Sequence, residues 1–306
     1  MNMSKKIIVV GSSNTDMVVQ VPHIPAPGET VMGSELLTIQ GGKGANQAVG
    51  AARAGGDVVF IACVSDDTFG TDSIENYKKD NIDTSFIKVE PGMHSGVALI
   101  NVAEDGENSI AVAPGANSYL LPEDIMKAKD AFSGAGAVLV QLEIPLETVA
   151  AVAILAEEMK IPMILNPAPG AKLPEDILKR ISIITPNETE AALLTGTREV
   201  NDDTIPVMAK KLYDLGIETV ILTLGSRGVY LLSSEFRGMI PGYSVKAVDT
   251  TAAGDVFNGA LATALSGNKT VRQAIDFAQR AAAISVTRMG AQPSAPPLEE
   301  IYDYKF

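Results

Sequence analysis

Short runs of apolar residues recur along the chain, and segments with helical spacing separate them. The runs cover residues 7–11, 58–65, 137–143, 162–167, 181–186 and 219–225. They are continuously apolar rather than alternating, which is typical of strands in a sheet covered on both faces. The helical patterns cover residues 44–54, 68–80, 146–159, 204–215, 255–266 and 270–287. This alternation predicts the α/β class, a three-layer sandwich built on a parallel sheet with right-handed crossovers.

Two segments interrupt the alternation and predict a second, smaller sheet. Residues 14–40 contain apolar stretches around a Pro- and Gly-rich turn, without a convincing helix. Residues 94–113 contain two strand-like stretches on either side of an Asp105-Gly106 pair, which is a strong hairpin signal. We expect these segments to form a β-sheet lid on a single domain that spans residues 1–306.

The charge and the single cysteine narrow the class of protein. The formal net charge is −13, whereas nucleic-acid-binding proteins normally present a basic surface, so we expect no nucleic-acid partner. Residues 7–11 are too short for a signal-peptide core, and no stretch reaches the roughly 18 apolar residues of a membrane span. Cys63 is the only cysteine, which excludes an intrachain disulfide and suits a reducing compartment. The sequence therefore predicts a soluble, cytoplasmic protein.

Residues 249–265 combine an anion cradle with a carboxylate, and a strand-like stretch precedes them at 243–248. The three residues before Asp255 are Ala, Ala and Gly, so a ligand can approach their backbone N–H groups at the start of the predicted helix. Asp255 falls in the first turn of that helix. Phosphoryl transfer needs both parts, because N–H groups stabilise the phosphoryl charge while a carboxylate takes the proton of the attacking hydroxyl. The alternative is an Asp that only caps the helix.

Three short polar stretches lie where a parallel sheet binds ligands, beyond the carboxyl ends of its strands. Residues 12–16 follow a predicted strand, Glu143 ends another, and residues 41–46 open a predicted helix with two successive glycines. The side chains suited to binding sugar hydroxyls are Asn14, Asp16, Lys43, Asn46 and Glu143. The glycine pair does not have the spacing of a Walker A loop. Taken alone, these stretches also fit tight or solvated turns.

Together these stretches resemble the ribokinase family of carbohydrate kinases, and the resemblance spans essentially the whole chain. The matching motifs are NTD at 14–16, GGKGAN at 41–46, GANSYL at 115–120, LNPAPG at 165–170, TPNETEA at 185–191, TLGSRG at 223–228, DTTAAGD at 249–255 and TRMGAQPS at 287–294. Each motif is weak alone, but their order and spacing make the set specific. The resemblance implies a ribokinase-like fold with a β-lid. It also implies ATP-dependent phosphorylation of a sugar hydroxymethyl group, with O5 of D-ribose as the expected acceptor and ribose catabolism as the setting.

The resemblance further implies a role for each matching residue. Asp255 would be the general base, and the anion hole would be Ala252, Ala253 and Gly254. The sugar would be held by Asn14, Asp16, Gly42, Lys43, Asn46, Glu143 and Asp255. The nucleotide would lie against Thr223, Gly225, Ser226, Gly228, Gly254 and Gln279, while Asn187 and Glu190 would organise Mg²⁺ and the phosphates through water. A monovalent cation, K⁺, would lie beside the anion hole at Asp249, Thr251, Ser285, Arg288, Gly290 and Ser294.

Two positions depart from the family pattern. Gln279 stands where an aromatic-like or amide contact to adenine, often His, is expected. Ser285 replaces a small apolar residue of the cation loop, a change that should be tolerated if backbone carbonyls bind the ion.

Other functions are compatible with the sequence. A kinase of the same family for deoxyribose, fructose or a nucleoside such as adenosine would share most of these residues. A sugar-sensing protein that kept the fold and lost catalysis is disfavoured by the intact Asp255 and anion hole. A Rossmann-type dehydrogenase is disfavoured because no Gly-x-Gly-x-x-Gly follows the first strand. The apolar outer positions of the lid also predict a homodimer through paired lids.

Overall fold

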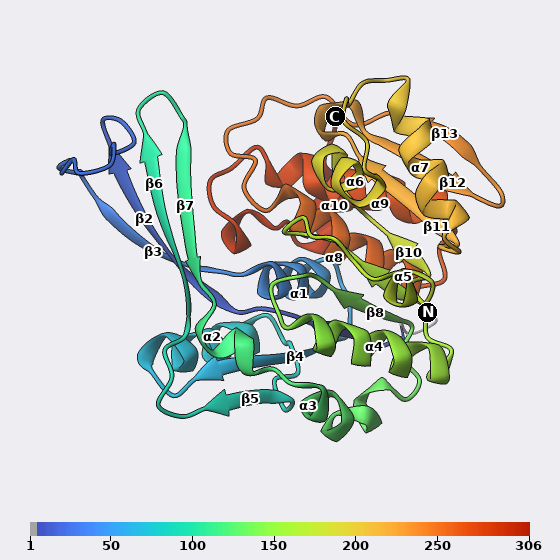
Figure 1. The fold of residues 1–306 in the computed structure, drawn as a ribbon, viewed down its shortest axis with the longest axis horizontal. Coiled ribbons are helices and arrows are strands. Elements are labelled where there is room, and N and C mark those ends of the chain that lie inside the picture. The colour runs from blue at the N-terminus through green and yellow to red at the C-terminus, as the bar shows by residue number, and fades with distance from the viewer. Residues whose placement is uncertain (1–4) are drawn as a thin grey trace.

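A nine-stranded sheet forms the centre of the computed structural model, which describes residues 5–306 (Figure 1). Its strands are β1 (Ile7–Val10), β4 (Val58–Ser65), β5 (Ile87–Glu90), β8 (Ala137–Val140), β9 (Met163–Leu165), β10 (Ile183–Ile184), β11 (Thr219–Thr223), β12 (Val229–Ser233) and β13 (Arg237–Ile240). Their order in space is β13-β12-β11-β10-β9-β8-β1-β4-β5. Neighbours from β5 to β11 run parallel, and β12 and β13 are antiparallel at one edge.

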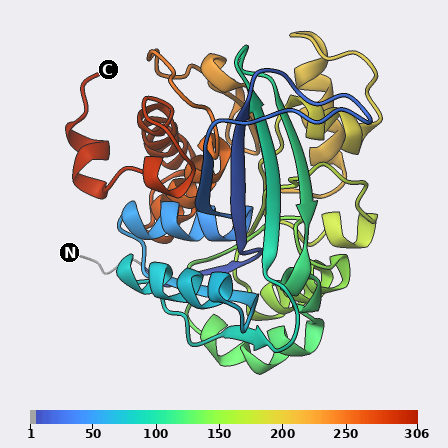
Figure 2. The same ribbon diagram turned by 90° about the vertical axis from the view of Figure 1, so that its left-hand side faces the viewer.

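Helices cover both faces of this sheet. They are α1 (Lys43–Arg53), α2 (Thr68–Lys79), α3 (Pro122–Lys127), α4 (Leu146–Met159), α5 (Glu175–Leu178), α6 (Glu188–Thr195), α7 (Thr204–Asp214), α8 (Ala253–Ser266), α9 (Val271–Ser285) and α10 (Leu298–Asp303). The core on one face includes residues of α1, α2, α8, α9 and α10, and the core on the other face includes residues of α3 to α7. Figure 2 shows α8, α9 and α10 (orange and red) on one side of the molecule and α4 and α7 on the other.

The alternation of side chains along each strand explains the two cores. On β1, Ile7 and Val9 belong to one core, and Ile8 and Val10 belong to the other. All four side chains are fully buried. Successive residues of a strand point to opposite faces, so a strand between two helical layers must be apolar throughout.

A second sheet stands apart from the first, at the left of Figure 1. It contains β2 (Asn14–Val21), β3 (Leu36–Gly41), β6 (Gly96–Ala103) and β7 (Asn108–Ala113), in the order β3-β2-β6-β7. The pair β6 and β7 is an antiparallel hairpin that turns at Gly106, whose φ is 88°. The strands expected within residues 14–40 and 94–113 are therefore confirmed.

The six predicted buried strands and the six predicted helices are also confirmed, with ends that shift by a few residues. The strand-like interpretation of residues 243–248 is wrong, because that segment pairs with no strand. It follows the edge strand β13 and lies against α9 and the residues after it. The hydroxyl of Tyr243 donates to Asp276 at 2.7 Å, and N of Val248 donates to O of Val286 at 2.7 Å.

The edge strands β12 and β13 were not expected. β12 follows β11 through a short connection that contains Gly225 (φ 57°) and Gly228 (φ 96°), and such a connection joins antiparallel strands rather than parallel ones. Within residues 5–306, no helix has the length and apolar character needed to traverse a bilayer.

Candidate active site

Several predicted sugar residues lie at the carboxyl ends of the parallel strands. The chain leaves β1 toward β4 and later returns to its other side at β8, which makes the β1/β8 boundary the switch point where such sheets bind ligands. Residues 11–16 follow β1, and residues 141–143 follow β8. The start of α1 is joined to this edge, because N of Ala45 donates to O of Ser12 at 2.8 Å.

Asp255 lies in the first turn of α8, as predicted, but its side chain does not cap that helix. Its Oδ2 accepts a hydrogen bond from Nδ2 of Asn46 at 3.1 Å, and its Oδ1 accepts one from Nε2 of Gln47 at 2.9 Å. Burial raises the pKa of Asp255 above its ordinary value, although Lys43 and the two amide donors lower it. The site thus contains a buried carboxyl group, fixed at both oxygens and more basic than a solvated one.

The residues before Asp255 form an open cradle. Ala252 has left-handed dihedral angles (φ 57°, ψ 11°), which are uncommon for a residue with a side chain and concentrate at functional sites. Gly254 is exposed, and a Cβ there would meet nothing within 4 Å. The N–H groups of Ala253 and Val256 donate to carbonyls of the preceding loop. Those of Gly254 and Asp255 have no acceptor within residues 5–306, which leaves them free for an anion.

Glu143 and Lys43 meet at the switch point. Oε2 of Glu143 accepts hydrogen bonds from Oγ of Ser12 at 2.5 Å and from the backbone N of Lys43 at 3.0 Å. Burial alone would lower the pKa of Lys43, but the surrounding carboxylates, Asp255 and Glu143 foremost, raise it above its ordinary value. Lys43 is therefore a protonated amine that is surrounded by carboxylates.

Asp16 lies half-buried on β2. Burial raises the pKa of Asp16 to about 6, with further contributions from Glu143 and Asp255, while Lys43 opposes the shift. A Cβ on Gly41 of β3, which pairs with Asn14, would lie 2.2 Å from Oδ2 of Asp16, so glycine at this position leaves room for the carboxylate. Like-charge repulsion from Glu143 and Asp255 therefore adds to the effect of burial at Asp16.

Asn14 is held by a residue that the sequence analysis did not single out. Its Oδ1 accepts a hydrogen bond from Nδ2 of the buried Asn117 at 2.7 Å, and Oδ1 of Asn117 accepts one from N of Ser13 at 2.8 Å. Gly42 has a φ of 89°, and a Cβ there would lie 2.7 Å from N of Asn14. Asn117 therefore fixes the first residues of the second sheet.

Sequence reasoning missed several polar residues that hold the predicted ones in place. They are Ser12, Gln47, Asn117, Gln141, Asn166 and Asn258. All six are buried. For Gln141 and Asn166, a polar residue inside a run predicted to be a buried strand was the available signal, because such groups nearly always have hydrogen-bond partners.

The predicted nucleotide residues lie beyond β10 and β11. Asn187 and Glu190 form a reciprocal capping box at the start of α6, in which each side chain accepts the other's backbone N–H at 2.8 Å. Asn187 pairs with Thr223 in an isolated bridge between the two segments. Ser226 is exposed in the turn after β11. Burial raises the pKa of Glu190, and within the described residues its Oε2 accepts a hydrogen bond whereas its Oε1 accepts none.

Gln279 is buried on α9 and donates from Nε2 to O of Pro241 at 3.2 Å. Its Oε1 is buried without a hydrogen-bond partner in the described chain. The adenine contact predicted for this residue stays a prediction.

The predicted cation residues join two segments beside the cradle. Asp249 accepts hydrogen bonds from N of Thr251 at 2.9 Å and from N of Gly290 at 2.8 Å. Burial opposes ionisation of Asp249, but these bonds lower its pKa below its ordinary value. Arg288 donates to Glu300 at 2.5 Å, so its guanidinium is engaged elsewhere.

Two other residues predicted for the cation loop have hydroxyl groups that donate to backbone carbonyls three residues earlier in the chain. Oγ of Ser285 donates to O of Ala282 at 2.9 Å, and Oγ of Ser294 donates to O of Ala291 at 2.8 Å. Both residues are buried. Any contribution of this loop to an ion would therefore come from Asp249 and backbone carbonyls.

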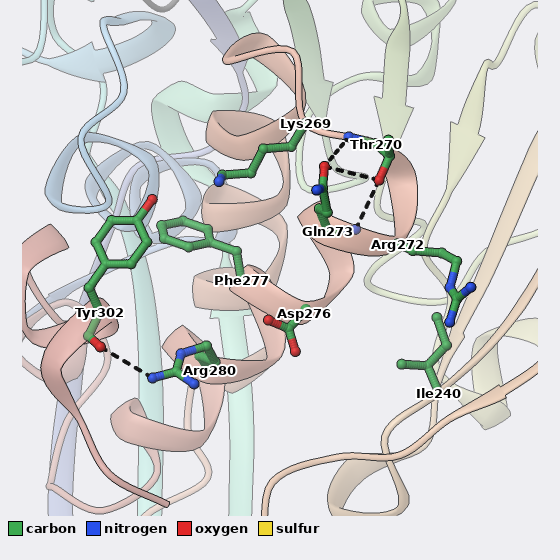
Figure 3. Close-up of a pocket in the computed structure, with 9 residues that line it drawn as sticks. All are labelled: Ile240, Lys269, Thr270, Arg272, Gln273, Asp276, Phe277, Arg280 and Tyr302. Carbon is green, nitrogen blue, oxygen red and sulfur yellow. Dashed lines mark hydrogen bonds between the residues drawn. The ribbon is translucent and has the colours of Figure 1, made fainter. Parts of the chain in front are cut away.

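A cleft of about 750 Å³ lies along α9 (Figure 3). It is lined by Ile240, Lys269, Thr270, Arg272, Gln273, Asp276, Phe277, Arg280 and Tyr302. Thr270 and Gln273 form a capping box, in which each side chain accepts the other's backbone N–H. Arg280 donates to the backbone carbonyls of Ile301 and Tyr304. No predicted site residue lines this cleft.

Comparison with known proteins adds the family context. A family model for pfkB family carbohydrate kinases matches residues 4–298. The ribokinase of Haemophilus influenzae is 43% identical over 302 residues, which cover 99% of each chain. The crystal structure of ribokinase from Thermotoga maritima is similar with a TM-score of 0.90 and 40% identity, covering 97% of this chain and 98% of that one. The structure of Arabidopsis thaliana ribokinase complexed with ribose and ATP has a TM-score of 0.89 and 31% identity, covering 98% of both chains.

Proposed function

Because the chain belongs to the pfkB family of carbohydrate kinases, we propose that it transfers the γ-phosphate of ATP to O5 of D-ribose and so makes ADP and D-ribose 5-phosphate. The roles of the residues are inferred from two groups that lie together at the start of α8. There the buried carboxyl group of Asp255 adjoins two backbone N–H groups that have no acceptor in residues 5–306. A base and an anion cradle in one helical turn are what phosphoryl transfer to a hydroxyl requires.

Asp255 takes the proton of the O5 hydroxyl as that oxygen attacks the γ-phosphorus. The new bond from O5 to phosphorus forms while the bond from phosphorus to the β–γ bridging oxygen breaks, and ADP leaves with that oxygen. The raised pKa of Asp255 favours this proton transfer, because burial makes its carboxylate more basic. The N–H groups of Gly254 and Asp255 stabilise the charge on the phosphoryl oxygens.

The sugar is held by the acceptors and donors around the switch point. Asp16, Glu143 and Asn14 supply oxygens, and Lys43 and Asn46 supply N–H donors. Oδ1 of Asn46 is buried without a partner in the described chain, which suits it to a substrate hydroxyl. Closure of the second sheet as a lid, after the sugar binds, would exclude water from these groups.

The nucleotide lies against Asn187, Thr223 and the glycine turn that follows β11. Residues 5–306 hold no group of three or more His, Cys, Asp or Glu side chains that could bind a metal ion. Mg²⁺ commonly binds through one or two carboxylates together with substrate phosphates and water. The free Oε1 of Glu190 fits that mode, and bound Mg²⁺ would neutralise phosphate charge. Since ATP is an intracellular solute, we place the reaction in the cytoplasm.

The loop at Asp249 fits a monovalent cation, since it offers a carboxylate whose pKa is lowered and which bonds to N of Thr251, just before the cradle. When bound, K⁺ would add positive potential beside the anion hole. We expect kcat to rise when K⁺ replaces a bulky organic cation at constant ionic strength. Asp249→Ala should blunt this response, whereas Glu300→Ala, which frees Arg288 but leaves Asp249, should keep it. A wild-type kcat that is equal with and without K⁺ would contradict the proposed site.

We also propose that two copies pair through the outer face of the lid. The register places Leu99 beside Met17 and Leu36 beside Val19, on the face opposite Asp16. Leu36 is 61% exposed and Leu99 is 54% exposed, which makes this face apolar and uncovered in one chain. Sedimentation equilibrium should give twice the 32.1 kDa of one chain, and Leu99→Lys should give the monomer mass. A wild-type monomer at micromolar concentration would refute the pairing.

A further inference from the structure

Gln47 is a fully buried amide that contacts the proposed base directly. Its Nε2 donates to Oδ1 of Asp255 and to Oδ1 of Asn166, both at 2.9 Å. Its Oε1 accepts a hydrogen bond from Nε2 of Gln141 at 2.6 Å. The three partners come from α8 and from the residues after β9 and β8, so Gln47 joins the elements that meet at the switch point.

The orientation of this amide is determined by its neighbours. Nδ2 of Asn166 donates to O of Thr185 at 3.2 Å, and a backbone carbonyl can only accept. Oδ1 of Asn166 must therefore face Gln47, which needs an N–H donor there. Rotating the amide of Gln47 by half a turn would place its oxygen against both Oδ1 of Asn166 and the carboxylate of Asp255. In the orientation that makes all three hydrogen bonds of its amide, Gln47 therefore presents an N–H group to Asp255.

We propose that Gln47 is a positioning residue, which orients the Asp255 carboxylate and stabilises its ionised form through a hydrogen-bonded row of amides from Thr185 to Gln141. The proposal rests on the role of Asp255 as the base. It assigns to Gln47 no contact with sugar or nucleotide.

The charged groups around Asp255 explain why a neutral donor matters there. Lys43 on α1 favours the carboxylate, whereas Glu143, after β8, disfavours it. Asp16 on β2 and Glu190 on α6 couple to Asp255 as further like charges. Burial already raises the pKa of this group, and the hydrogen bonds from Gln47 and Asn46 lower it.

The test is Gln47→Met, which preserves volume and removes both N–H donors. The readout is the single-turnover rate of phosphoryl transfer at saturating ribose and MgATP, measured against pH. The reactive form is the carboxylate, so activity is lost as pH falls through the pKa of Asp255. Removing a donor to that carboxylate raises this pKa, and we expect the acid limb to move upward by about one pH unit. The KM for ATP should stay at its wild-type value.

Thr148→Val is the matched control, because it removes a buried hydrogen bond, 2.6 Å to O of Leu120, on the other face of the sheet. It should lower the melting temperature without moving the acid limb. Gln141→Met leaves the N–H groups of Gln47 in place but frees its Oε1, so it should move the limb in the same direction by less. This second variant decides the matter if Gln47→Met does not fold.

Acid limbs of both variants that coincide with the wild type would overturn the proposal. So would a shift in Thr148→Val equal to that in Gln47→Met, since the effect would then be general destabilisation. Failure of the proposed function is distinguishable, because it appears as near-wild-type rates in Asp255→Asn. If Asp255→Asn abolishes transfer while Gln47→Met keeps the wild-type acid limb, only the role of Gln47 is lost.

Discussion

Asp255→Asn is expected to lower kcat by at least about 10²-fold, because a positioned general base typically contributes about 10²–10⁴ in rate. The substitution preserves the size of the side chain but removes its capacity to take the O5 proton. Ribose binding should remain measurable by calorimetry, since Asn14, Lys43 and Glu143 are unchanged. Steady-state kinetics with ADP detection gives kcat, and the melting temperature verifies the fold.

Asp203→Asn is the matched control for that variant. Asp203 is an exposed carboxylate at the start of α7 and makes no side-chain cap there. Its substitution should leave kcat unchanged. Near-wild-type kcat in Asp255→Asn would reduce Asp255 to a structural residue and remove the base from the mechanism.

Asp16→Ala is expected to lower kcat/KM for ribose by about 10- to 10²-fold, because a hydrogen bond to a charged group contributes about 1.5–3 kcal/mol. It should also lower the ratio of kcat/KM for ribose to kcat/KM for 2-deoxyribose. A site built to bind a hydroxyl rejects the analogue that lacks it, since its own buried group is left unpaired, and the variant no longer has that carboxylate. The measurement is kcat/KM for both sugars.

Asp16→Asn is the companion variant, because it keeps an acceptor oxygen and should keep part of the selectivity. The wild-type pH dependence adds a check. The carboxylate of Asp16, with its pKa raised to about 6, should accept sugar hydroxyls fully only above that pH. Its contribution to kcat/KM is therefore lost as pH falls through about 6. This acid-side loss of kcat/KM should not occur in Asp16→Ala, which has no carboxylate at that position. Equal losses for ribose and deoxyribose in Asp16→Ala would contradict its role in selectivity.

The main fold was predictable because its signals are local. A strand covered on both faces must be apolar at every position, and six such runs stand out against helical spacing. The edge pair β12 and β13 was harder, since an edge strand needs no continuous apolar run. Residues 243–248 look like a strand in composition, yet a strand also needs a neighbour with free hydrogen-bonding groups, and composition does not show one.

The site was predictable only in part, for a related reason. Asp255 and the small residues before it form a motif within one helical turn. The contacts that fix Asp255 come from Asn46 and Gln47, more than 200 residues away in the sequence. Gln47 and Asn117 resemble ordinary polar residues until the fold buries them. The reciprocal cap of Asn187 and Glu190 could have been read from their spacing, because a capping box has that signature.

We expect this chain to phosphorylate D-ribose at O5. The most direct measurement combines wild-type protein with MgATP, K⁺ and D-ribose, and follows product by ³¹P NMR and ADP release. We predict one ADP for each ribose 5-phosphate formed. We also predict a kcat/KM for ribose above those for 2-deoxyribose, fructose and adenosine measured in parallel. A kcat/KM for fructose or adenosine comparable with that for ribose would contradict the substrate assignment, and ADP release that no sugar stimulates would contradict the kinase itself.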